Sequence, residues 1–141
     1  MTAATTRKPN WQSLLDELIR DRASRPFEYG TNDCCLFACD CVEAVTGHDP
    51  GADLRGTYTA EQGAQALVER LGGVAAIAAD RAGEEIGPLL AQVGDVVLVQ
   101  FGGRDTLAVC LGTRAAAPGP TGLVMLPMRC AQRAWRCMKA E

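Results

Sequence analysis

The chain has 141 residues, of which 48% are apolar and 22% charged, and its formal net charge is −3. This length fits a single domain with a substantial core, and the negative charge argues against a nucleic-acid-binding surface. No apolar run approaches the roughly 18 residues that a membrane span needs. The first residues lack the apolar centre of a secretory signal, so we expect a flexible arm over 1–9 and one folded domain over 10–141.

Helical patterns occupy the first half of the chain. An amphipathic stripe predicts a helix over 10–22. A second, mostly apolar helix is expected to begin at Cys34, with Asp33 or Asn32 as its N-cap and Gly47 in the C′ position.

Two more helices are expected before Pro88. Thr59 and Gln62 have the spacing of a capping box, which predicts a third helix that ends near Leu71. A further short helix is expected over 74–82. The intervening segment over 48–58 is rich in turn residues and is expected to be a loop.

Apolar, β-branched segments after Pro88 predict antiparallel strands, and Gly102-Gly103 is a hairpin turn signal. The expected strands cover 95–101, 106–112, 122–128 and 134–138, with a loop over 114–120. Helices followed by antiparallel strands indicate an α+β domain, in which N-terminal helices pack on a small antiparallel sheet or barrel.

Seven cysteines are many for this length. Without a signal peptide we expect them to be reduced thiols, with Cys110, Cys130 and Cys137 as small buried hydrophobic residues. Zinc and iron–sulfur sites favour Cys-x-x-Cys pairs, and the sequence contains none. Cys35 and Cys39, at i and i+4, would chelate a metal only if strand cysteines joined them. Packing in the core is the favoured interpretation, and no metal or other cofactor is expected.

Cys34 differs from the other cysteines because it would lie on the first turn of a helix, where the helix dipole favours thiolate over thiol. It is therefore a candidate nucleophile, and an unused or buried thiol is the alternative. The only histidine, His48, lies 14 residues further along the chain. The intervening helix separates the two by about 20 Å, whereas proton transfer requires about 3 Å, so we expect a loop role for His48.

Three motifs occur in a suggestive order. They are Asp33-Cys34-Cys35-Leu36-Phe37, then Gly94-Asp95-Val96-Val97, then Leu107-Ala108-Val109-Cys110-Leu111-Gly112. In this order they resemble the NlpC-type cysteine peptidases, papain-like cell-wall endopeptidases that are also found in tail gene modules of tailed phages. The resemblance covers residues 27 to 126 and implies a papain-like fold. Together with the loops at 46–50 and 55–58 and with Ala134-Trp135-Arg136, the whole chain resembles a small phage protein family related to those peptidases.

The resemblance implies that Cys34 occupies the nucleophile position, and that Thr106 stands where the family has its base histidine. A hydroxyl cannot act as a general base at neutral pH, so the cysteine–base pair is incomplete. The following expected strand, Leu123-Val124-Met125-Leu126, offers no polar side chain to orient a base. The sequence therefore indicates a degenerate peptidase.

The favoured hypothesis is a structural or assembly component of a tailed-phage tail tip or baseplate. Such a protein would be made in the host cytoplasm and located in the virion tail, with other tail-tip or hub proteins, and also peptidoglycan, as partners. One alternative is an active cell-wall cysteine endopeptidase used in phage entry, with Cys34 as nucleophile. A thiol–metal protein is a third hypothesis.

The C-terminal segment has a positive bias. Its basic residues are Arg129, Arg133, Arg136 and Lys139. We interpret them as solvated charge on an edge strand, which discourages unwanted strand pairing. A docking strip for an acidic neighbour is the alternative.

Overall fold

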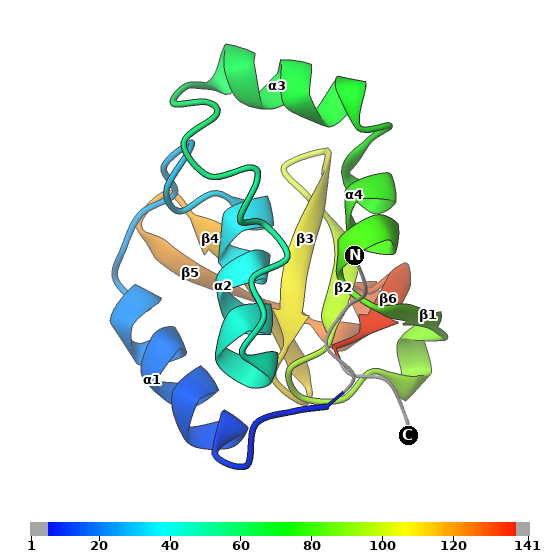
Figure 1. Cartoon of the computed structure of the whole chain (residues 1–141). Coiled ribbons are helices and arrows are strands. Elements are labelled where there is room, and N and C mark those ends of the chain that lie inside the picture. The colour runs from blue at the N-terminus through cyan, green and yellow to red at the C-terminus, as the bar shows by residue number, and fades with distance from the viewer. Residues whose placement is uncertain (1–5, 138–141) are drawn as a thin grey trace.

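A computed structural model describes residues 6–137 of the chain. Within this range the protein is an α+β structure, with four α-helices and one antiparallel six-stranded sheet (Figure 1). The helices are α1 (Trp11–Arg22), α2 (Cys34–Thr46), α3 (Glu61–Arg70) and α4 (Val74–Arg81). The strands are β1 (Glu84–Ile86), β2 (Val96–Phe101), β3 (Arg104–Cys110), β4 (Arg114–Gly119), β5 (Gly122–Pro127) and β6 (Arg133–Arg136).

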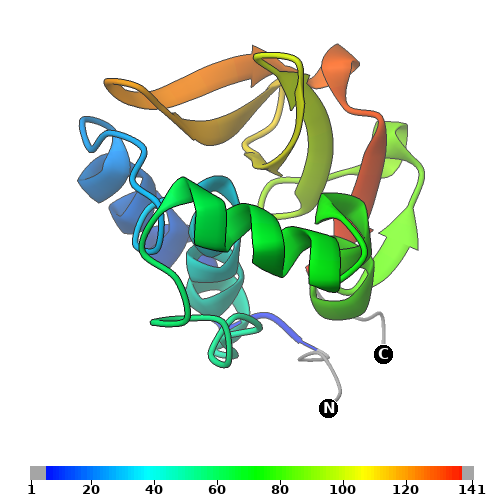
Figure 2. The ribbon, with the colours of Figure 1, turned by 90° about the horizontal axis from the view of Figure 1, so that it is seen from above.

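The helices lie on one side of the sheet, whose strand order is β1-β6-β2-β3-β4-β5. Helix α2 packs against β3, α1 lies beside α2, and α3 crosses above the start of α2 (Figures 1 and 2). Alternate side chains of β3 pack into two hydrophobic clusters, one on each face of the sheet, as expected for a strand with both faces covered. Leu107 and Val109 face Phe37 and Cys41 of α2, whereas Ala108 packs in a second cluster on the other face.

The expected helix beginning at Cys34 is confirmed, and so are its ends. Asp33 caps it by accepting a hydrogen bond from the N–H of Leu36, and Gly47 ends it in the left-handed conformation, with φ at 82°. The hairpin at Gly102-Gly103 is also confirmed, because Phe101 faces Arg104 across the turn.

The expected loop over 114–120 is wrong, because these residues include β4. Alanine, proline and glycine are poor strand formers, which hides the strand in the sequence. Ala115, Ala116 and Ala117 are fully buried, and β4 pairs with β5 along its whole length. Strand pairing and burial therefore override a weak local preference.

Other local expectations also differ from the structure. The capping box at Thr59 is wrong, because α3 starts at Glu61 and has no side-chain cap. Cys110 and Cys137 are buried as expected, but Cys130 is exposed. The expected strand over 134–138 corresponds to β6, although Met138 lies outside the described residues.

The basic C-terminal residues do not mark a sheet edge. Strand β6 lies between β1 and β2, and Arg133 forms an ion pair with Glu85 of β1 at 2.8 Å. Because β6 has a neighbour on both sides, the interpretation as edge-strand charge is wrong. Lys139 lies outside the described residues.

The end of the expected N-terminal arm is held in place. The guanidinium of Arg7 lies 2.9 Å from the buried carboxylate of Asp95 and stacks over the ring of Trp11. The N–H of Lys8 donates to the carbonyl of Val45 at 2.8 Å. Residues 7 and 8 therefore belong to the folded structure rather than to a flexible arm.

Among the described residues, none of the helices combines the length and apolar character needed to cross a membrane.

Candidate functional site

The candidate site is a cleft of about 1090 Å³ beneath α3. Its floor includes the start of α2, and its walls come from α3, the β2–β3 hairpin and the end of β4. Among its lining residues are Cys34, Cys35, Tyr58, Leu67, Asp105 and Thr106. Cys34 and Thr106, the two residues that the sequence analysis proposed for the site, therefore line the same cleft.

The carboxylate of Asp33 stabilises the start of α2. One carboxylate oxygen accepts from the N–H of Leu36 at 2.9 Å, and the other accepts from the N–H of Gly30 at 3.0 Å and from the hydroxyl of Tyr58. Burial, followed by the bond to Asp33, raises the pKa of Tyr58. Asp33 is thus a structural residue, and the phenol of Tyr58 stays protonated beside the cleft.

The thiol of Cys34 is the group in the cleft best suited to be a thiolate. A hydrogen bond from the thiol of Cys35 lowers the pKa of Cys34, and the backbone N–H of Leu107 contributes in the same direction. Burial and the charge of Asp33 act against these contacts without reversing the shift. The same bond and burial raise the pKa of Cys35. The two thiols therefore titrate as a coupled pair, in which Cys34 loses its proton before Cys35.

Thr106 directly precedes Leu107, whose backbone N–H helps to lower the pKa of the Cys34 thiol. Its hydroxyl donates to the carbonyl of Arg104 at 3.1 Å, and its side chain is almost fully buried. A threonine hydroxyl does not take up a proton at neutral pH. Thr106 therefore cannot serve as a general base for Cys34.

The histidine is far from the thiol. His48 follows Gly47 at the far end of α2, whereas Cys34 is the first residue of this helix. Thirteen helical residues span about 20 Å, so the imidazole is out of reach of the thiol. The backbone N–H of His48 donates to the hydroxyl of Thr46, in keeping with the expected loop role.

The strand after β3 is β4, not the segment over 122–128 that the sequence analysis took as next. Its three central residues are alanines: Ala115, Ala116 and Ala117. This strand, like the segment considered before, carries no polar side chain in its centre to orient a base.

The other cysteines are not arranged for metal binding. No group of three or more His, Cys, Asp or Glu residues within 6–137 has the geometry to hold a metal ion. All seven cysteines are free, and burial raises the pKa of Cys39 to about 12. The thiol–metal hypothesis therefore has no support from the arrangement of the described residues.

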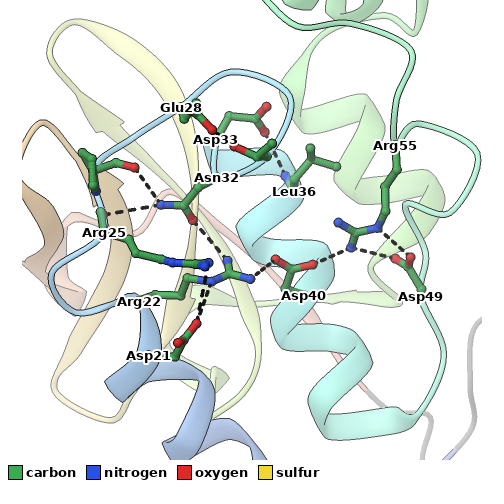
Figure 3. A network of polar contacts seen from close by, with 12 residues as sticks. Asp21, Arg22, Arg25, Glu28, Asn32, Asp33, Leu36, Asp40, Asp49 and Arg55 are labelled. Atoms are coloured by element: carbon green, nitrogen blue, oxygen red, sulfur yellow. Dashed lines mark hydrogen bonds and ion pairs between the residues drawn. The ribbon is translucent and has the colours of Figure 1, made fainter.

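A network of ion pairs holds the loops that flank the start of α2 (Figure 3). The carboxylate of Asp40, on α2, contacts Arg22 of α1 at 2.7 Å and also Arg55 of the 48–58 loop. Arg55 continues to Asp49 at 2.8 Å, and Arg22 donates to the side chain of Asn32 at 3.1 Å. The sequence analysis missed this network because its paired residues are 6 to 18 positions apart in the sequence and form no local pattern.

Comparison with known proteins gives a family but no activity. The family described as "Domain of unknown function (DUF6950)" matches residues 6–137. No curated protein matches the chain.

Proposed function

The chain belongs to this family of unknown function. From the sequence resemblance and the cleft, we propose that it is a structural or assembly component of a tailed-phage tail tip or baseplate, built on a degenerate NlpC-type, papain-like scaffold. The helix-then-sheet order and the cleft at the start of α2 support the scaffold. One observation supports the loss of catalysis. Cys34 and Thr106 line the same cleft, whereas His48 follows the far end of α2. The protein then acts by binding, in a virion tail, to other tail-tip or hub proteins.

Three measurements test this proposal. Purified protein incubated with peptidoglycan should release no muropeptides in a Cys34-dependent manner, as judged by mass spectrometry. Peptides from the chain should be found in purified virions of a phage that carries the gene, and in its tail-assembly intermediates. Cys34→Ser should leave tail assembly intact. Absence from both virions and intermediates would overturn the tail role.

One observation favours a second candidate, an active cell-wall cysteine endopeptidase. The pKa of Cys34 is lowered, which is a property that a nucleophilic thiol requires. This activity needs a base from a partner subunit or from the substrate. Peptidoglycan cleavage that Cys34→Ser abolishes would establish it.

A further inference from the structure

The backbone of β3 opens onto the cleft on the side away from β2. Phe101 and Arg104 close the two-residue turn at Gly102-Gly103, and such a closing pair exchanges backbone hydrogen bonds. In an antiparallel ladder these bonded pairs alternate with pairs that share no hydrogen bond. The backbone N–H and C=O groups of Asp105 and Leu107 therefore point away from β2.

Strand β4 leaves this part of β3 uncovered. Only Val109 and Cys110 of β3 are paired with β4. The N–H of Leu107 contributes to the lowered pKa of the Cys34 thiol. Within residues 6–137, no strand pairs with β3 at Asp105 on this side, and Asp105 lines the cleft. The cleft thus contains a short free strand edge, to which an extended peptide can add.

The walls of the cleft carry unbalanced negative charge. Asp105 and Glu69 of α3 both line it, and neither takes part in an ion pair with any residue of the described range. The carboxylate of Asp105 accepts only an uncharged donor, the side chain of Gln100. The positive charge of Arg104 is already offset by Glu61 at 3.1 Å. A cationic occupant is therefore favoured.

We propose that the cleft binds an extended, basic segment of a partner protein as a short strand added to β3. The backbone of this segment pairs with Asp105, and its Lys or Arg side chains meet Asp105 and Glu69. Apolar side chains on the alternate face contact the apolar lining, which includes Phe27 and Leu67. This inference rests on the proposed function, because it names the class of partner for the same cleft.

The probes are two blocked peptides, acetyl-Val-Lys-Val-Lys-Val-amide and acetyl-Val-Glu-Val-Glu-Val-amide, titrated into the ¹⁵N-labelled chain. The lysine peptide should shift the amide resonances of Asp105 and Leu107 in a saturable way. It should bind at least about tenfold more tightly than the glutamate peptide, because opposite charge favours one and like charge opposes the other. A lysine peptide N-methylated at alternate residues, which removes its strand-pairing donors, should lose binding. Equal affinity for the two charged peptides, or shifts confined to another surface, would overturn the proposal.

Charge variants test the two carboxylates separately. Asp105→Asn and Glu69→Gln should each weaken binding of the lysine peptide about two- to fivefold, the range expected for an exposed ion pair. Glu17→Gln on α1 is the matched control and should have no effect. Unchanged affinity in both cleft variants would contradict the charge assignment.

Mass spectrometry of the same samples separates this inference from the proposed function. Intact lysine peptide with saturable binding supports both. Hydrolysis of the bound peptide would refute the loss of catalysis and leave the strand-addition site standing. Failure to bind would refute only the site.

Discussion

The backbone N–H of Leu107 helps to lower the pKa of the Cys34 thiol, and so couples the first turn of α2 to the stretch of β3 that β4 leaves uncovered. The adjacent Thr106 lines the same cleft as Cys34. Hydrogen bonding to the charged form of a thiol stabilises the thiolate. The cleft therefore holds a thiol with a lowered pKa, and the only histidine of the sequence, His48, lies beyond the far end of α2.

Thr106→His should bring an imidazole into the cleft that Cys34 lines. An imidazolium beside Cys34 favours the thiolate, so alkylation of Cys34 by iodoacetamide at pH 6 should become about tenfold faster, which corresponds to one unit of pKa. The rate is measured by mass spectrometry of the Cys34 peptide. Thr106→Val is the matched control and should react at the wild-type rate. Identical rates in all three proteins would show that residue 106 does not face the thiol.

The seven thiols should react in an order set by burial and pKa. Cys34, with its lowered pKa, and Cys130, which is exposed, should be alkylated first in the folded protein at pH 7.5. Cys39, Cys41 and Cys137 should react at least about a hundredfold more slowly, because burial raises the pKa of each. Peptide mass spectrometry over time gives the rates. Faster labelling of Cys35 than of Cys34 would contradict the assignment of charge within the pair.

Asp40→Asn should destabilise the fold strongly. The carboxylate of Asp40 neutralises Arg22 and Arg55, and its side chain is only 13% exposed. Leaving a largely buried guanidinium without its partner costs about 3 kcal/mol in the free energy of unfolding, measured by urea denaturation. Asp16→Asn, which breaks an exposed pair with Arg20, is the control and should cost about 0.5 kcal/mol or less. Equal losses in the two variants would show that the network contributes nothing beyond surface charge.

The protein should lose stability in alkaline solution. Burial raises the pKa of Cys39 and of Cys137 from 9.0 to about 12. Because the folded state disfavours both thiolates, this stabilisation is complete below the unfolded pKa of about 9 and is lost as the pH rises from 9 towards 12. Tm should therefore fall over this range. Cys39→Ala and Cys137→Ala should each lower Tm at pH 7 but give a shallower alkaline decline, and an unchanged decline would contradict the prediction.

The parts of the fold with strong local signals could be predicted from the sequence. The helix that starts at Cys34 has a cap at Asp33 and a C′ glycine, and Gly102-Gly103 marks the hairpin, so short-range chemistry is sufficient for both. Strand β4 could not be predicted because its alanines and proline prefer other structures and are buried only by β5. Strand β1 has three residues and depends on pairing with β6, about 50 residues later.

The same distinction applies to the candidate site. Cys34 was identified because its helix start is a local feature, and the distance to His48 follows from helix geometry alone. The partnership of Cys34 with Leu107 and the free edge at Asp105 depend on where β4 leaves β3. No sequence pattern within β3 or β4 indicates where the two strands separate.

The ion pair between Arg7 and Asp95 fixes the point at which the chain enters the fold. Any module fused directly before Thr6 would start from an anchored position beside β2, so a short, rigid junction would give it a defined orientation. Removing Arg7 would release that anchor and leave a buried carboxylate without its counter-charge. Engineered fusions should therefore retain residues 7 and 8 and place any flexible spacer ahead of them.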